Sequence, residues 1–409
     1  MIILNFILQA IKIILLLGIL VIIHELGHFA VAKFFKMPVN EFSIGFGKKL
    51  WSKKFGDTNY SIRLFPLGGF VDLGDDDREG TFEKSPLYQK NLVLVAGTFV
   101  NLVFALLLAF IVLAVQGNFT TNIVDYVKED TNASQYILPG DEIYSINGKK
   151  VNSKTQIDTV MYANKGESLQ IEVIRNGQKL EFTIKPYKEE YIITGFSVDA
   201  NNNIVAIEGN TKDKLQIGDV VKQLQGVDVE NSDELIEEAF KYLDEEVTIQ
   251  VLRNNEIITT QVDVSKFDRY FVGIGFVVAD ENILNTIYYA CIGTGDFLYE
   301  TVKGLGQLIT GKTQNAELMG IVGVSDMITK TGSFLEYIAI MASVSLSLAI
   351  INILPLPLLD GGKIVIYTIE KYRKKQFKDS FINTISIITL ALLIALTIYV
   401  TVNDIIRLV

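Results

Sequence analysis

Long apolar segments alternate with polar stretches along the chain. Leu, Ile, Val and Phe dominate four of these segments, residues 2–35, 92–115, 334–359 and 381–402. About 20 mostly apolar residues are enough to cross the hydrocarbon core of a bilayer, so the pattern predicts four membrane spans. A fifth segment, residues 283–312, is only mildly apolar and is broken by glycines. This composition favours an amphipathic interfacial helix over a span.

The polar stretches contain two β-rich regions. Within residues 36–90, NYSIRLFPLGGFVDL (59–73) partly alternates and is rich in β-forming residues, which predicts strands or a hairpin. Residues 119–270 contain a repeat, because GDEIYSING (140–148) aligns with GDVVKQLQG (218–226). A second pair of blocks, 171–184 and 249–262, aligns at the same offset of 78 residues. We therefore expect two copies of one small β-rich module.

These patterns predict a polytopic α-helical membrane protein with a β-hairpin element and two inserted modules. The expected parts, in chain order, are a first membrane helix (1–35), the hairpin region (36–90), a second membrane helix (91–117), the two modules (118–188 and 189–270), the interfacial helix (283–312), a third membrane segment (334–362) and a fourth membrane helix (381–403).

Charge sets the expected orientation and excludes one class of partner. The net charge is −10 and no basic stripe is present, which argues against nucleic-acid binding. Lysine and arginine are concentrated after the first span and between the third and fourth. Such loops lie in the cytoplasm, so the hairpin region is expected to be cytoplasmic or associated with the cytoplasmic side of the membrane, and the two modules are expected outside the cytoplasm. The lone Cys291 excludes an internal disulfide and a zinc site built on cysteine pairs.

The two histidines of the chain both lie in the first predicted span. His24 and His28 are one helical turn apart and, with Glu25, form the pattern H-E-x-x-H. Two imidazoles on one helix face suit Zn²⁺, and the glutamate can accept a proton from the water that zinc activates. The alternative is a pair of histidines that only form hydrogen bonds to neighbouring helices. Ionisable groups inside a span are usually functional, which favours the metal site.

A catalytic zinc usually has a third protein ligand, and Asp360 is the candidate. It ends an apolar segment, follows Pro355 and Pro357, and precedes two glycines, a composition that predicts broken helix at membrane depth. An aspartate that only caps the span is the alternative. Asn352, in the same segment, could bond a substrate backbone or simply bridge helices.

These residues resemble those of the site-2 protease family of intramembrane zinc metalloproteases. The resemblance rests on His24-Glu25-Leu26-Gly27-His28 in a first span and on NILPLPLLDGG (352–362) in a late one. It extends to the bacterial regulator of sigma-E protease branch through GFGKKLW (45–51), PLGGFV (66–71), KSPLYQK (84–90) and the pair Gly97 and Asn101. Tandem PDZ domains in that branch correspond to the repeat. Thr98 departs from the family's usual proline, and the second PDZ copy is degraded at Gln225-Gly226.

The resemblance implies a Zn²⁺-dependent protease of the bacterial cell membrane. Its expected substrates are single-span anti-sigma factors or remnant signal peptides in the lipid bilayer, cut first by another protease. We expect the 59–73 strands to offer an edge to an unwound substrate, with Ile62, Leu64, Gly68 and Gly69 as contacts and Asn352 on the other side. A hairpin that only packs the spans is the alternative.

The extracytoplasmic PDZ pair has two interpretations. It either binds newly exposed carboxyl termini or, as we favour because the second copy is degraded, bars substrates with bulky outer domains. The rival functions for the whole chain are a non-catalytic PDZ-bearing membrane scaffold, in which the histidines are structural, and a metal transporter. A transporter requires a chain of polar residues through the spans, and the sequence contains one cluster.

Overall fold

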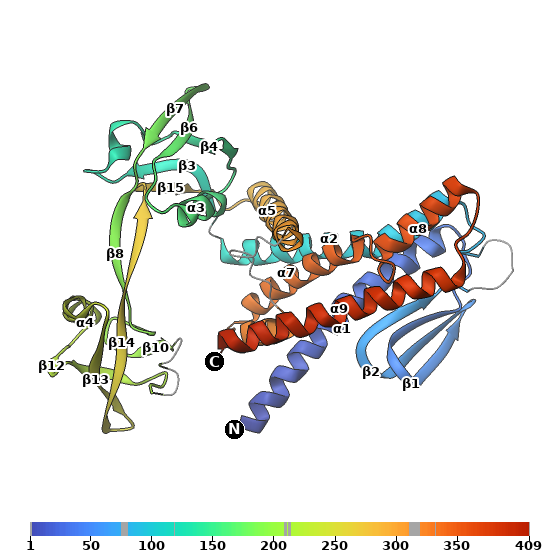
Figure 1. Ribbon diagram of the computed structural model, residues 1–409, viewed down its shortest axis with the longest axis horizontal. Helices are drawn as coiled ribbons and strands as arrows, with labels where there is room; N and C mark the ends of the chain where they lie inside the picture. The colour runs from blue at the N-terminus through green and yellow to red at the C-terminus, as the bar shows by residue number, and fades with distance from the viewer. Residues whose placement is uncertain are drawn as a thin grey trace. The chain divides into compact units, whose positions relative to one another are not determined.

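The computed structural model describes residues 2–74, 81–117, 119–207, 211, 214–310, 320–331 and 333–408. These residues form two compact units (Figure 1). The first unit combines Met1–Phe119 with Asp280–Ile406, and the second is mainly Thr120–Ala279. Residues 311 and 312, at the end of the expected interfacial helix, lie outside the described residues.

Four helices of the first unit are long and apolar enough to cross a membrane. Each coincides with one of the four predicted spans: α1 (Ile2–Phe34), α2 (Leu87–Gln116), α7 (Phe334–Ile353) and α9 (Asp379–Leu408). Helices α1 and α2 pack closely because Gly27 has no side chain, and a Cβ there would lie 2.4 Å from the carbonyl oxygen of Ala96. On α7, the hydroxyl of Ser345 donates to the backbone carbonyl of Asn101 on α2 at 2.9 Å.

The third membrane segment is broken, as its prolines and glycines predict, and 334–362 is not one continuous helix. Helix α7 ends at Ile353, and the next helix is α8 (Asp360–Arg373). A tight turn that starts at Leu354 separates the two helices. The prolines at 355 and 357 cannot donate a backbone hydrogen bond, so the helix cannot continue through them. The turn is instead closed by Leu356 N donating to Leu354 O at 2.7 Å and by Leu359 N donating to Leu356 O at 2.8 Å.

Two further helices cover the spans. Helix α5 (Ile283–Ile309) packs on α2 and α7, and its Leu284 and Tyr288 are exposed. Helix α6 (Ile321–Lys330) was not predicted. Its first turn is held by the buried Asp404 of α9, whose Oδ2 accepts hydrogen bonds from the backbone nitrogens of residues 320 and 323 at 2.9 and 2.8 Å.

The predicted hairpin is present, and its two strands pair twice. Strands β1 (Glu41–Phe55) and β2 (Thr58–Asp72) both bend. Residues 41–44 therefore pair with 59–62 on one side and with 69–72 on the other, while 59–62 also pair with the second half of β1. The result is a sheet of four short segments, in which 69–72 form one edge and 51–55 the other.

The second unit contains two modules with the same order of elements. In the first are β3 (Thr120–Val127), β4 (Glu142–Ile146), β5 (Lys149–Lys150), α3 (Lys154–Ala163), β6 (Leu169–Arg175) and β7 (Gln178–Ile184). In the second are β10 (Ile204–Ile207), β11 (Val220–Leu224), β12 (Val227–Asp228), α4 (Ser232–Ala239), β13 (Glu245–Arg253) and β14 (Glu256–Phe271). From β4 and β11 onward, corresponding elements begin 78 residues apart except at β13, so the sequence repeat is a repeat of structure.

One ion pair occurs at the same place in both modules. The guanidinium of Arg175 donates to both carboxylate oxygens of Asp141 at 2.7 Å. In the second module, Arg253 donates to Asp219 at 2.8 and 2.7 Å. Both aspartates are almost completely buried. The two ion pairs are again 78 residues apart. In the first module the pair joins the loop before β4 to β6, and in the second it joins the loop before β11 to β13.

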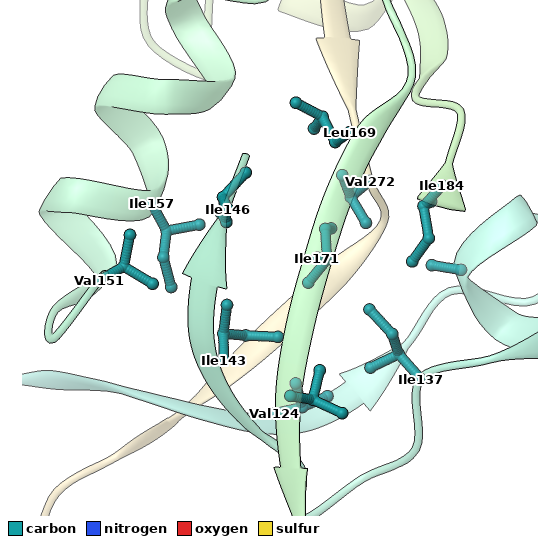
Figure 2. Close-up of a cluster of buried hydrophobic side chains, with 12 residues drawn as sticks. Val124, Ile137, Ile143, Ile146, Val151, Ile157, Leu169, Ile171, Ile184 and Val272 are labelled. Carbon is teal, nitrogen blue, oxygen red and sulfur yellow. The ribbon is translucent and has the colours of Figure 1, made fainter. Parts of the chain in front are cut away.

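The modules exchange strands, which the predicted boundaries missed. Strand β15 (Ile274–Val278) pairs with β3 in the first module, although it follows the second module in sequence. Val272 accordingly lies in the first module's core beside Ile171 (Figure 2). Conversely, β8 (Tyr187–Ile193) pairs with β14 of the second. The expected limits 118–188 and 189–270 therefore omit the strand that completes the first sheet. The short β9 (Phe196–Val198) pairs with β10.

Candidate metal centre

Two histidines and one aspartate, far apart in sequence, meet in the first unit. His24 and His28 lie on α1 with their Nε2 atoms 3.1 Å apart. The Oδ2 atom of Asp360, at the start of α8, lies 3.1 Å from Nε2 of His24 and 3.2 Å from Nε2 of His28. All three side chains are buried. The expected meeting of the third segment with the H-E-x-x-H helix is therefore present in the structure.

The broken segment between α7 and α8 places Asp360 at this point. A Cβ on Gly361 would lie 2.0 Å from the carbonyl oxygen of Ile353, and one on Gly362 would lie 2.0 Å from that of Leu356. Real Cβ atoms do not approach backbone this closely. The two glycines thus let the first turn of α8 fold back against the preceding turn, and this brings the Asp360 carboxylate beside the histidines.

A glycine of α2 forms the surface on which the imidazoles lie. A Cβ on Gly97 would be 2.6 Å from Nε2 of His28 and 2.7 Å from Cε1 of His24. One turn earlier, the carbonyl oxygen of Val93 accepts a hydrogen bond from Nδ1 of His28 at 2.7 Å. This bond fixes the proton on Nδ1 and leaves the Nε2 lone pair of His28 directed toward Asp360. The sequence indicated Gly97 only as one of the residues that carry the family resemblance, and it gave no sign of Val93, because a backbone partner carries no side-chain signal.

The remaining candidates on this side are Asn352 and Glu25. The Nδ2 atom of Asn352, in the last turn of α7, lies 3.5 Å from Nδ1 of His24. Glu25 is half-buried on α1. A Cβ on Gly69 of β2 would lie 3.6 Å from Cγ of Glu25, so the edge segment 69–72 of the hairpin passes next to this glutamate.

The hairpin residues proposed as substrate contacts fall in two different places. Ile62 pairs with Ile44 on one side and with Trp51 on the other, so it lies inside the sheet and offers no free edge. The expectation for Ile62 was wrong, because the bent strands pair twice. Leu64 lies in the same strand and is half-exposed. Gly68 has φ 136° and a Cβ there would overlap the ring of Phe46, so it forms the bend that leads into the edge segment.

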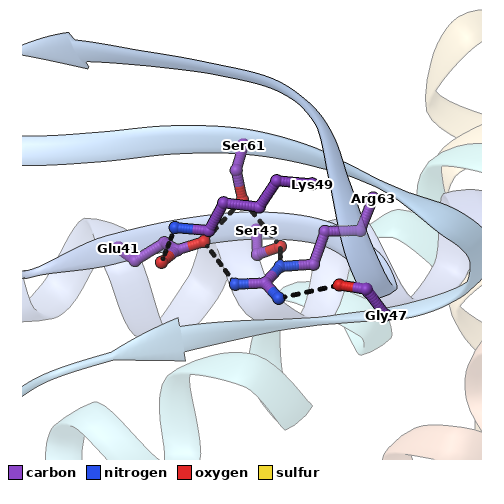
Figure 3. A network of polar contacts seen from close by, with 6 residues as sticks. All are labelled: Glu41, Ser43, Gly47, Lys49, Ser61 and Arg63. Atoms are coloured by element: carbon purple, nitrogen blue, oxygen red, sulfur yellow. Dashed lines mark hydrogen bonds and ion pairs between the residues drawn. The ribbon is translucent and has the colours of Figure 1, made fainter.

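A polar network holds the bent strands in this arrangement (Figure 3). Arg63 donates to Glu41 at 2.8 Å, to the Ser43 hydroxyl at 2.9 Å and to the carbonyl of Gly47 at 3.0 Å. Lys49 and Ser61 also donate to Glu41, at 2.8 and 2.6 Å. Burial would raise the pKa of Glu41, but these hydrogen bonds outweigh burial and hold the pKa at about 2. The carboxylate is therefore charged at neutral pH and joins both halves of β1 to β2.

The donor set of His24, His28 and Asp360 fits a zinc ion. Their ligand atoms lie within 4.8 Å of one another. Two imidazole nitrogens and one carboxylate oxygen form a common set of three protein ligands for catalytic zinc, which keeps its fourth position open. The absence of a Cβ at Gly97 leaves the two rings the room to hold this arrangement.

Comparison with known proteins agrees with this chemistry. The family model described as Peptidase family M50 matches residues 12–396. A Fusobacterium nucleatum protein whose name proposes a zinc metalloprotease is 28% identical over 412 residues, which cover 96% of this chain and 97% of that protein. The Haemophilus influenzae regulator of sigma E protease is 27% identical over 441 residues, with 97% and 98% covered. A solved PDZ domain of an SdrC-like protein from Listeria innocua has 27% identity and a TM-score of 0.16, covering 16% of this chain and 75% of that domain.

Proposed function

The chain belongs to peptidase family M50, and we propose that His24, His28 and Asp360 hold a zinc ion with which it hydrolyses peptide bonds inside the membrane. One observation carries this proposal. Ligand atoms from α1 and α8, 336 residues apart, lie 3.1 Å from each other in a unit whose long helices can cross a bilayer. Ionisable side chains buried inside a membrane span are energetically costly and rare, and they usually mark a functional site.

The chain's own residues divide the work of hydrolysis. Zinc, when bound, supplies the Lewis acidity that lets water attack near neutral pH and that polarises the scissile carbonyl. Glu25 adjoins the ligand His24 and accepts a proton from the attacking water, then passes it to the leaving nitrogen. The hydrogen bond from His28 to Val93 keeps that imidazole in the tautomer with a free Nε2 lone pair.

The edge segment of the hairpin is suited to present the substrate. A transmembrane helix hides its carbonyls in its own hydrogen bonds, so it must unwind before attack. Residues 69–72 pair only with 41–44 in the part of the chain that the structure describes, and Gly69 adjoins Glu25. An unwound substrate strand that pairs along this free edge would bring its backbone to the proton acceptor. This role replaces the one first expected of Ile62.

The substrates are membrane proteins, and we propose single-span anti-sigma factors or remnant signal peptides that another protease has already cut. A relative named regulator of sigma E protease supports the anti-sigma assignment. The clusters of lysine and arginine after α1 and in α8 support a bacterial membrane orientation with the second unit outside the cytoplasm. We propose that its two modules are PDZ domains that bar uncut substrates with bulky outer domains.

The test of this function measures zinc and cleavage separately. Purified full-length protein in nanodiscs should bind one zinc per chain and should cleave a model transmembrane peptide until a chelator removes the metal. Glu25→Gln should keep the zinc and lose cleavage. A chain that binds no zinc, or a Glu25→Gln variant with full activity, would refute the assignment; the first result would favour a PDZ-bearing scaffold.

A further inference from the structure

Each histidine that binds a metal through Nε2 carries its proton on Nδ1. That N–H needs an acceptor, which fixes the ring's orientation and raises its basicity. For His28 the acceptor is the carbonyl oxygen of Val93, at 2.7 Å. For His24, the polar group that the structure places at Nδ1 is the carboxamide of Asn352.

We propose that Asn352 is the positioning residue of His24, with its amide oxygen accepting the Nδ1–H of that imidazole. This inference rests on the proposed function only in taking zinc as the ion at the site. The amide nitrogen lies 3.5 Å from Nδ1 in the structure. A half-turn of a carboxamide exchanges its nitrogen and oxygen at nearly unchanged positions. When Nδ1 of His24 carries a proton, it would face the NH₂ group of Asn352, and two facing donors repel each other. A half-turn of the carboxamide places its oxygen at Nδ1 and converts the contact into a hydrogen bond.

The position of Asn352 fits this role. It lies in the last turn of α7, directly before the broken segment that delivers Asp360. Helix α7 is joined to α2 by the hydrogen bond from Ser345 to the backbone of Asn101. One segment therefore supplies both a metal ligand and the partner of another ligand. A change in the end of α7 would alter two of the three metal contacts together.

This role differs from a contact with the substrate backbone, and the two predict different measurements. A positioning residue controls zinc affinity, whereas a substrate contact controls KM. Loss of the partner of a metal-bound histidine typically weakens metal affinity about 10- to 100-fold. Asn352→Leu removes both polar atoms at similar size, and Asn352→Asp keeps an oxygen acceptor. Ser347→Ala is the matched control, because that hydroxyl bonds within α7 to Ser343 O.

The experiment titrates Zn²⁺ into the full-length variants in nanodiscs against a competing chelator, and it measures KM for a transmembrane peptide at saturating zinc. Asn352→Leu should weaken zinc binding about 10- to 100-fold, while Asn352→Asp and Ser347→Ala should stay within a few-fold of wild type. Unchanged zinc affinity of Asn352→Leu with a raised KM would overturn the inference and assign a substrate contact. Equal losses in Asn352→Leu and Asn352→Asp would also overturn it. Wild-type protein without zinc would refute the proposed function instead.

A spectroscopic readout distinguishes positioning from general damage. The chain has two histidines, so ¹⁵N-histidine labelling gives signals from only two imidazoles in the zinc-loaded protein. Asn352→Leu should shift the Nδ1 signal of His24 and leave that of His28 in place, because Val93 still accepts the latter's hydrogen bond. An unchanged His24 signal would contradict the proposal even if zinc affinity fell.

Discussion

Adding one methyl group beneath the histidines is the sharpest mutation that the structure offers. In Gly97→Ala, the new Cβ would lie 2.6 Å from Nε2 of His28 and 2.7 Å from Cε1 of His24. Ordinary contacts begin at 3.4 Å, so the rings or α2 must retreat by the difference, about 0.8 Å. The His28 ring cannot move freely away from α2, because its Nδ1 donates a hydrogen bond of 2.7 Å to the carbonyl of Val93, on the helix that also carries Gly97.

The magnitude follows from this displacement. Forcing extra volume into a packed site costs about 1–3 kcal/mol of stability. A misplacement of catalytic groups by about 1 Å can cost about 100-fold in rate, which corresponds to about 2.7 kcal/mol of activation free energy. We therefore expect Gly97→Ala to fold with a modestly lowered Tm, to bind zinc more weakly and to lose about two orders of magnitude in kcat/KM.

The assay compares Gly97→Ala with Gly293→Ala in the same nanodiscs. A Cβ on Gly293, in α5, meets nothing within 4 Å, so this control adds the same methyl group to a helix without a clash. Its Tm should be unchanged or raised, because alanine is favoured over glycine in a helix by about 0.5–1 kcal/mol. Wild-type zinc affinity and kcat/KM in Gly97→Ala would mean that the imidazoles do not lie against Gly97 of α2.

Three further predictions concern other parts of the molecule. Gly361→Ala should abolish zinc binding, because its Cβ would lie 2.0 Å from the carbonyl of Ile353; stoichiometric zinc in the purified variant would contradict this. Arg253→Met should destabilise the second unit by about 3–5 kcal/mol, since it leaves the buried Asp219 carboxylate without its partner. The hydrogen bonds from the Arg253 guanidinium outweigh burial and lower the pKa of Asp219 in the folded protein. The ion pair therefore stabilises the fold fully above the unfolded carboxyl pKa of about 3.9. This contribution is lost as the pH falls below that value toward the lower pKa of Asp219 in the folded state. Thermal unfolding followed by circular dichroism should accordingly show a smaller loss of Tm on acidification in Arg253→Met than in wild type, and equal losses would refute the linkage. Trp51, the single tryptophan, is 46% exposed on the apolar side of the hairpin. If this side contacts the membrane, brominated lipids should quench the Trp51 fluorescence more than aqueous iodide does. Stronger quenching by iodide would place the hairpin in water.

Segment length and residue chemistry were enough to predict the four apolar helices and the meeting of His24, His28 and Asp360. A helix that must cross a bilayer leaves a long apolar run, and this fixed the positions of α1, α2, α7 and α9. The i, i+4 spacing of His24 and His28 places both rings on one helix face. With no further histidine in the chain, an aspartate beside helix-breaking prolines was the natural candidate to join them.

Features that depend on long-range pairing were not predictable from local pattern. Ile62 was expected at an edge, but the bends at Gly45 and Gly68 fold the hairpin into four segments and place Ile62 inside. Similarly, the 78-residue repeat marks corresponding elements but not which module receives β15. A weaker similarity between YIITGFSV (191–198) and FVGIGFVV (271–278), at an offset of 80 residues, was the signal that could have revealed the exchanged strands.

Zinc K-edge X-ray absorption of the full-length protein tests the shared metal site most directly. The spectrum should show two imidazole nitrogens and oxygen ligands at about 2.0–2.2 Å. Asp360→Ala should lower the oxygen contribution or the zinc content while His24 and His28 remain. A spectrum without imidazole ligands, or one that Asp360→Ala leaves unchanged in both shape and zinc content, would contradict the account.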